Sequence, residues 1–284
     1  MLIARKMGEL NKEEVGNILD STIVSMLVVS SVFFVLIKVF LHQILEFMLT
    51  NQDIIAKCQE FLDYRMLGLI PSFISFVFIA FYSGIGRTNI LAISIAVMTF
   101  FNITLNYGLV YGKFGLPEIG VGGSGLATSI SETLAVLVLF GGTFYKRRIH
   151  DFFLCRFKKF DIQLIKEMSN IAVPLMLQSF AAVGGWLFFF ARIETVLGKD
   201  SLAISSIFRQ LILFFTIPTW SLGSTANTII SNMVGQKDFS EVKIAIRRIS
   251  LVSLAFAIFA CLIIYIFPTF CIGIFTSKQD YTLI

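Results

Sequence analysis

Long apolar stretches alternate with short polar segments along almost the whole chain. A helix that crosses a bilayer needs about 20 mainly apolar residues, and several of these stretches exceed that length, which predicts tilted or kinked helices. The pattern predicts seven spans, at Thr22–Leu41, Leu62–Gly84, Ile90–Tyr111, Gly120–Thr143, Ile171–Val196, Leu202–Met233 and Ile249–Phe275.

Three prolines, Pro71, Pro174 and Pro218, lie within these spans or at their start. Proline has no backbone N–H and therefore removes a hydrogen bond from a helix interior. Each proline predicts a local opening of its helix, which serves either as a packing kink or as a hinge or unwound site.

Composition agrees with a membrane protein. The 284 residues are 56% apolar and 14% charged, whereas soluble domains average about 45–50% and about 25%. So little polar surface excludes a disordered protein, a typical soluble enzyme and a small secreted scaffold. We expect an all-α, polytopic bundle of membrane helices.

No motif of an enzyme or of a metal site occurs in the sequence. The four cysteines are scattered, and neither HExxH nor GxSxG is present. We therefore predict no enzymatic activity, no metal site and no permanently bound cofactor.

The positions of the basic residues predict the orientation. When the amino terminus is placed on side one, the loops of that side carry 15 Lys and Arg, and the loops of the other side carry 4. Cytoplasmic loops are enriched in Lys and Arg, so the amino terminus is predicted to be cytoplasmic. The basic stretch Lys146–Lys166 is interpreted as a cytoplasmic linker at the lipid headgroups rather than as a nucleic-acid site.

An internal repeat is present at an offset of 227 residues, with nine identities in 57 pairs. Both copies have the same topology, which is the parallel-repeat plan of many transporters. A complete two-copy protein would need roughly 454 residues and twelve spans. We therefore expect a middle segment of a longer transporter that does not catalyse coupled efflux alone; the alternative is a seven-span protein with a partial duplication. The matching pairs include Gly8-Glu9 with Gly235-Gln236, Glu14-Val15 with Glu241-Val242, and Phe40 with Phe267.

Residue patterns at Ile3–Glu9, Asn102–Thr128 and Ile217–Gln236 resemble those of the multidrug and toxic compound extrusion (MATE) transporters. Asn102–Thr128 resembles the junction of the fifth and sixth helices of that family, and Ile3–Glu9 the end of the second. Ile217–Gln236 is similar to the eighth helix. The resemblance implies two lobes of six helices, with 1–150 in an amino-terminal lobe lacking its first two helices. Residues 151–284 would form a carboxy-terminal lobe lacking its last three.

The resemblance also implies a function. We expect a monomer in the plasma membrane that exports small amphipathic or cationic drug-like compounds in exchange for Na⁺ or H⁺. Its other partner is the bilayer, and no nucleic acid is expected. A flippase for lipid-linked sugars and a seven-span receptor or sensor are the alternatives.

Asn102 and Asn106 are the candidate cation-binding residues. They are four residues apart in an apolar span and therefore share a helix face. Amide oxygens can coordinate a hard cation, although both side chains could equally form hydrogen bonds between helices. The resemblance implies part of a cation site here. The family often has Asp at the second position, and Asn106 cannot titrate.

Other polar and aromatic residues within spans are candidates for the substrate pathway. Glu132 lies near the bilayer middle, where a carboxylate must be protonated, paired or in contact with water. Aromatic rings such as Trp186 can stack on cations. The predicted pathway residues are Glu132, Gln178, Trp186 and Arg209.

Overall fold

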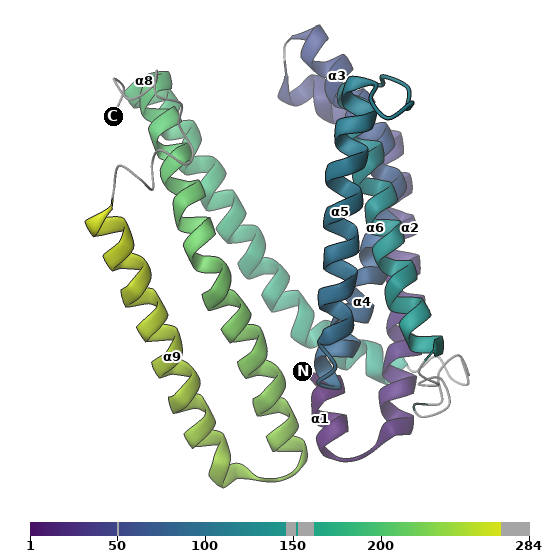
Figure 1. The fold of residues 1–284 in the computed structure, drawn as a ribbon, viewed down its shortest axis with the longest axis vertical. Helices are drawn as coiled ribbons and strands as arrows, with labels where there is room; N and C mark the ends of the chain where they lie inside the picture. Colours follow the sequence, from purple (N-terminus) through teal and green to yellow (C-terminus); the bar gives the residue numbers. More distant parts are fainter. Residues whose placement is uncertain (50, 146–151, 153–161, 268–284) are drawn as a thin grey trace. The chain divides into compact units, whose positions relative to one another are not determined.

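Helix boundaries in the protein follow capping residues in the sequence. The structure is a computed structural model, and it describes residues 1–49, 51–145, 152 and 162–267. The side chains of Asn51 and Asp238 each accept hydrogen bonds from backbone N–H groups of the helix that follows, which satisfies part of the exposed first turn. The elements are α1 (Leu2–Gly8), α2 (Lys12–Met48), α3 (Gln52–Arg65), the 3₁₀ segment η1 (Met66–Gly68), α4 (Leu69–Gly84), α5 (Asn89–Tyr111), α6 (Val121–Tyr145), α8 (Ile162–Gly235) and α9 (Phe239–Ile266) (Figure 1).

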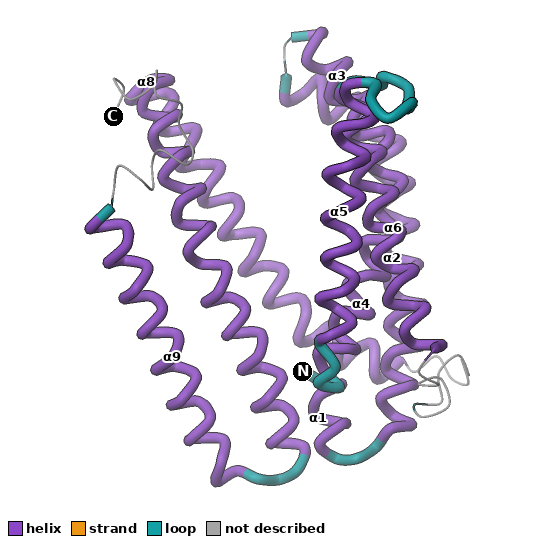
Figure 2. Tube along the Cα trace, viewed as in Figure 1, coloured by secondary structure: helices purple, strands orange, loops and turns teal. Residues whose placement is uncertain are grey.

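The all-α prediction is confirmed for the described residues, which form helices and loops without strands (Figure 2). Among the residues that the structure describes, six helical stretches are long and apolar enough to cross a membrane. The predicted stretch Leu202–Met233 is helical but is not among the six. The six are Lys12–Phe47, Gln52–Gly84, Asn89–Tyr111, Val121–Thr143, Gln163–Gly198 and Phe239–Ile266.

The chain separates into two compact units, Met1–Ile165 and Lys166–Ile284. The predicted lobe boundary between residues 150 and 151 lies outside the described residues, as does most of the predicted basic linker.

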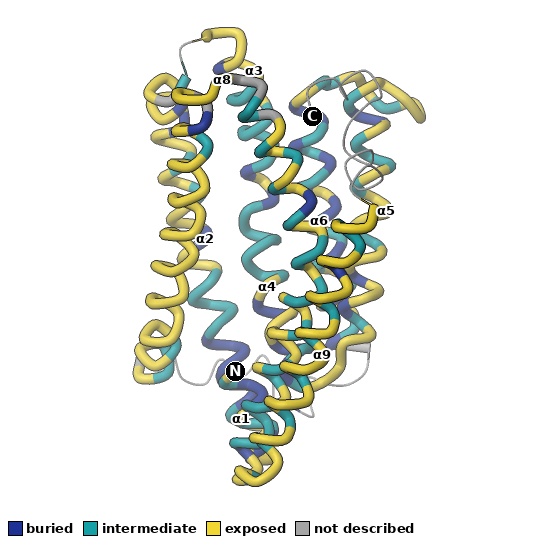
Figure 3. The backbone as a smooth tube through the Cα atoms, turned by 90° about the vertical axis from the view of Figure 1, so that its left-hand side faces the viewer, coloured by how far each residue is buried: buried dark blue, intermediate teal, exposed yellow. Residues whose placement is uncertain are grey.

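In the first unit, α6 packs against α5, α3, η1 and α4, and α2 packs against α4. The core lies where α1, α2, α4 and α6 meet, around Phe81, Tyr82 and Leu139. The buried Tyr82 hydroxyl lies 2.6 Å from Thr143 Oγ1 and donates to the Leu139 carbonyl at 3.1 Å. The second half of α2 is largely exposed (Figure 3), and most of its exposed side chains between Leu27 and Phe47 are apolar, as in a lipid-facing helix.

In the second unit, α8 consists of two helices joined at Gly198. This residue has φ 85° and ψ 179°, while Pro174 and Pro218 lie inside helical backbone. Neither proline therefore interrupts its helix, and the helix-breaking angles fall on a glycine, which has no Cβ to clash.

The sequence repeat is also a repeat of backbone geometry. The turns at residues 5–14 and 232–241 share three backbone hydrogen bonds and one capping hydrogen bond at the same offset of 227. Leu10 and Lys237 both have positive φ, 57° and 60°. Asn11 and Asp238 both accept a hydrogen bond from the backbone N–H three residues later. The matching backbone pairs are Glu9 N to Arg5 O with Gln236 N to Asn232 O, Leu10 N to Met7 O with Lys237 N to Val234 O, and Asn11 N to Lys6 O with Asp238 N to Met233 O.

In the first turn, Lys6 forms ion pairs with two acidic side chains. The Lys6 ammonium lies 3.0 Å from Glu9 and 3.0 Å from Glu14. Hydrogen bonds to these carboxylates raise the pKa of Lys6, and the hydrogen bond from Lys6 lowers the pKa of Glu9. Because the pKa of Glu9 is lower in the folded turn than in the unfolded chain, its ionised carboxylate stabilises the turn at pH values above the unfolded pKa. This stabilisation is lost as the pH falls through the folded pKa. The raised pKa of Lys6 also stabilises the turn, and this stabilisation is lost as the pH rises through the folded pKa of Lys6.

The positive φ of Leu10 and Lys237 leads to a prediction. A left-handed residue other than glycine costs about 1–2 kcal/mol, part of which glycine's larger unfolded-state entropy offsets. Leu10→Gly and Lys237→Gly are each expected to raise stability by roughly 0.5 kcal/mol. Ile246→Gly, in the exposed interior of α9, should lower it by about 1 kcal/mol. Thermal unfolding measures all three, and destabilisation by Leu10→Gly as large as that by Ile246→Gly would refute the assignment.

Candidate functional site

Asn102 and Asn106 are brought together on α5, and Thr128 of α6 joins them. The Asn106 amide nitrogen donates to the Asn102 carbonyl at 3.0 Å and to Asn102 Oδ1 at 3.2 Å. The Asn102 nitrogen donates to Thr128 Oγ1 at 3.2 Å, and Thr128 donates to the Ser124 carbonyl at 2.9 Å. The result is a half-buried polar cluster between two membrane helices, whose three side chains all carry oxygen.

Close packing of α6 against its neighbours positions this cluster. A Cβ on Gly123 would lie 2.7 Å from the Leu109 carbonyl oxygen of α5. A Cβ on Gly125 would lie 2.4 Å from the Phe61 carbonyl oxygen of α3. The glycines after Pro117 therefore permit close helix approach, as is common between membrane helices.

The sequence did not single out Thr128. Its position four residues before Glu132 places it one turn away on α6. A hydroxyl in an apolar span needs a hydrogen-bond partner, so the polar side chain of Thr128 could have marked it as a candidate.

Glu132 forms a bidentate ion pair with Arg65. Arg65 Nη1 lies 2.9 Å from Glu132 Oε2, and Nη2 lies 2.8 Å from Oε1. Ser72 Oγ donates to the same carboxylate. Of the possibilities that the sequence left open for Glu132, the structure shows pairing. Its partner is Arg65 of α3, which sequence reasoning had left without a role.

The remaining candidates lie on α8. The Arg209 guanidinium carbon lies 5.8 Å from the ring centre of Trp186 and 5.3 Å from that of Phe190. The two rings are stacked on each other, 5.8 Å apart. Arg209 and Trp186 are therefore brought together in a cation–π cluster, while Gln178 lies on the same helix with an exposed side chain.

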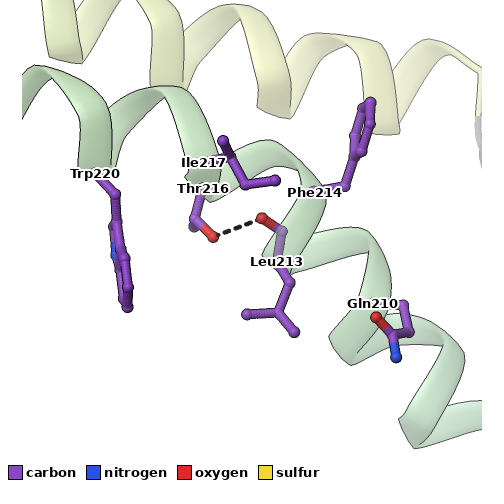
Figure 4. A pocket seen from close by; sticks show the side chains of 6 residues that line it. All are labelled: Gln210, Leu213, Phe214, Thr216, Ile217 and Trp220. Atoms are coloured by element: carbon purple, nitrogen blue, oxygen red, sulfur yellow. Dashed lines mark hydrogen bonds between the residues drawn. The ribbon is translucent and has the colours of Figure 1, made fainter. Parts of the chain in front are cut away.

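Two open grooves lie beside these residues on α8. One, of about 330 Å³, is lined by Ala181, Ala182, Gly185, Trp186 and Phe189. The other, of about 420 Å³, lies along the second half of α8 (Figure 4). Leu213 and Trp220 point to the same side of the helix there, and Thr216 Oγ1 donates to the Leu213 carbonyl at 3.0 Å. Both grooves are mainly apolar and aromatic.

The family model MatE matches residues 1–108 and 174–284, which is well over half of the chain. The chain belongs to the MatE family. Its members are transporters rather than enzymes, so the predictions of family and of a non-enzymatic, multi-pass membrane protein are confirmed.

Curated relatives and solved structures agree with the MatE assignment. The chain is 24% identical over 289 residues to "Probable multidrug resistance protein YoeA" of Bacillus subtilis, covering 99% of this chain and 61% of that protein. It is 28% identical over 231 residues to "Probable multidrug resistance protein NorM" of Thermotoga maritima, covering 80% and 48%. The chain thus spans about half to three fifths of these relatives.

The fold matches that of solved MatE transporters. A crystal structure of MATE in complex with MaL6 superposes with a TM-score of 0.90 at 16% identity, covering 99% of this chain and 62% of that one. An outward-facing multidrug resistance MATE transporter gives 0.88 at 16% identity, with 99% and 61% covered. The predicted all-α, multi-span fold is confirmed, and the solved MATE neighbours that it matches are twelve-helix transporters.

Proposed function

We propose that the protein acts in the export of small amphipathic or cationic compounds across the plasma membrane. The match to the MatE family and to relatives named as multidrug resistance proteins carries the proposal. The apolar and aromatic grooves beside Trp186 and Trp220 support it, since such surfaces accept flat apolar cations without a fixed set of polar contacts. Gln178 would lie along the same pathway.

Na⁺ is the proposed coupling ion, and Asn102, Asn106 and Thr128 are its proposed ligands. Their amide and hydroxyl oxygens are neutral and cannot take up a proton at physiological pH. In the described part of the chain, Asn106 Oδ1 accepts no hydrogen bond, which leaves an oxygen available. Hard cations bind oxygen ligands of this kind.

The orientation has the amino terminus in the cytoplasm. The 15-to-4 distribution of basic residues between the two sides supports it. Together with the rocking of two lobes that parallel repeats permit, this gives export from the cytoplasm driven by inward movement of Na⁺.

A dye-accumulation experiment tests the proposed export. The gene is deleted from its host and then restored at its own locus, and accumulation of ethidium, a flat lipophilic cation, is followed by fluorescence. Deletion is expected to raise the steady-state ethidium signal at least about twofold, and restoration should reverse the rise. Equal accumulation in the deleted and restored strains, for ethidium and for a panel of other lipophilic cations, would contradict multidrug export.

A further inference from the structure

The candidate span Gln52–Gly84 is broken in its middle. Helix α3 ends at Arg65, η1 occupies Met66–Gly68, and α4 begins at Leu69. Pro71 lies in the first turn of α4, where its ring lacks the N–H that an unbroken helix would use to reach Leu67. A short 3₁₀ segment within a long helix often marks a hinge.

Helix α6 adds side-chain hydrogen bonds to the backbone at the break. Ser129 Oγ donates to the carbonyl oxygens of Tyr64 at 2.8 Å and Arg65 at 3.2 Å. These are the last carbonyls of α3 before η1. Within a bilayer such groups need partners from the protein, because no water is at hand to bind them.

Glu132, one turn from Ser129 on α6, binds both sides of the break. Its carboxylate pairs with Arg65, the last residue of α3, and accepts from Ser72 in the first turn of α4. The same Ser72 hydroxyl lies 2.7 Å from the Gly68 carbonyl oxygen, so its single proton is shared between the two acceptors. One carboxylate therefore fixes the angle between the two parts of the span.

Glycine at position 68 makes room for this arrangement. A Cβ there would lie 2.7 Å from Arg65 Nη1, 2.8 Å from Glu132 Oε2 and 2.8 Å from Ser129 Oγ. The side chains of Arg65 and Glu132 are only 31% and 18% exposed. At this depth a broken ion pair leaves two poorly solvated charges, so the paired state is strongly favoured.

We propose that Glu132 is a positioning residue that holds a hinge at Met66–Gly68, and that this hinge bends during transport. Thr128 lies one turn from Glu132 on α6, so movement at the hinge reaches the helix that carries part of the candidate cation site. The link to transport rests on the proposed function, whereas the hinge itself does not.

Hydrogen–deuterium exchange of the full chain in lipid nanodiscs tests the hinge. In Glu132→Gln, the backbone amides of residues 66–70 are expected to exchange at least tenfold faster than in the wild type. Asp63→Asn is the matched control. Asp63 also lies on α3, but its ion pair with Lys38 of α2 does not connect the two sides of the break. Its exchange in this segment should stay within twofold of the wild type.

A second variant separates the loss of the hinge contact from misfolding caused by an unpaired Arg65 guanidinium. The double variant Arg65→Gln/Glu132→Gln removes both charges and should show the same faster exchange. In the dye-export assay, Glu132→Gln should lower the maximal rate about tenfold with KM within twofold of the wild type, whereas loss of a substrate contact would raise KM.

Two results would overturn the inference. One is exchange in the Glu132→Gln and double variants no faster than in Asp63→Asn. The other is faster exchange with an unchanged maximal rate of export. If the wild type exports nothing, the proposed function fails, and the exchange data alone decide whether Glu132 holds a hinge.

Discussion

Gly125→Ala is expected to lower the free energy of unfolding by about 2 kcal/mol or more. The added methyl group would lie 2.4 Å from the Phe61 carbonyl oxygen and 3.1 Å from the Arg65 backbone nitrogen. Both are backbone atoms, so no side-chain rotation can relieve the clash, and α3 must move away from α6. The same movement would lengthen the contacts that Ser129 and Glu132 make with α3.

Gly141→Ala on the same helix is the matched control. A Cβ at Gly141 meets no atom within 4 Å. Alanine forms helix better than glycine, so this variant should be neutral or more stable by up to about 1 kcal/mol. Chemical denaturation in detergent compares the two. If Gly125→Ala were as stable as Gly141→Ala, close approach of α3 and α6 could not be what holds the first unit together.

Hydrophobic length was sufficient to predict most of the spans, but not where a span bends. Pro71 predicted a local opening, and the observed break covers Met66–Gly68, just before it. The offset is physical, because a proline disturbs the preceding turn, whose carbonyl it leaves without a donor. The hydrogen bonds from Ser129 to the end of α3 could not be predicted, because they depend on how α6 packs.

The partners of the polar residues were the least predictable part. Glu132 required a partner by its depth alone, but Arg65 is 67 residues away in sequence, and no periodicity reveals which helices pair. Asn102 and Asn106 could be placed together because both lie on one helix at a spacing of four. Thr128 lies on the next helix, and its contact with Asn102 depends on the close approach permitted at Gly123.

The repeat was predictable because it recurs in local geometry. The turns at 5–14 and 232–241 share few identical residues, yet their backbone hydrogen bonds and positive φ values coincide at the offset of 227. Capping requires only a short polar side chain, which Asn11 and Asp238 both supply. The need for a capping side chain therefore preserves the polar pattern of the turn even where the residues are not identical.

The double variant Asn102→Ala/Asn106→Ala is expected to weaken Na⁺ binding at least tenfold, which corresponds to about 1.4 kcal/mol. It removes both amide oxygens and leaves Thr128 as a single remaining oxygen side chain in the cluster. Thr104→Ala is the matched control, because Thr104 lies between the two asparagines on α5 and donates only to the Phe100 carbonyl. The control should bind Na⁺ within twofold of the wild type.

The proposed role of Asn102 and Asn106 is to couple transport to Na⁺. Its most direct test is the initial rate of ethidium movement in membrane vesicles from cells that express the gene at its own locus, under an imposed gradient of Na⁺ or of H⁺. We expect the Na⁺ gradient to accelerate transport by the wild type and by Thr104→Ala, and the double variant to lose this response. A full response in the double variant, or a wild type that responds only to the H⁺ gradient, would contradict it.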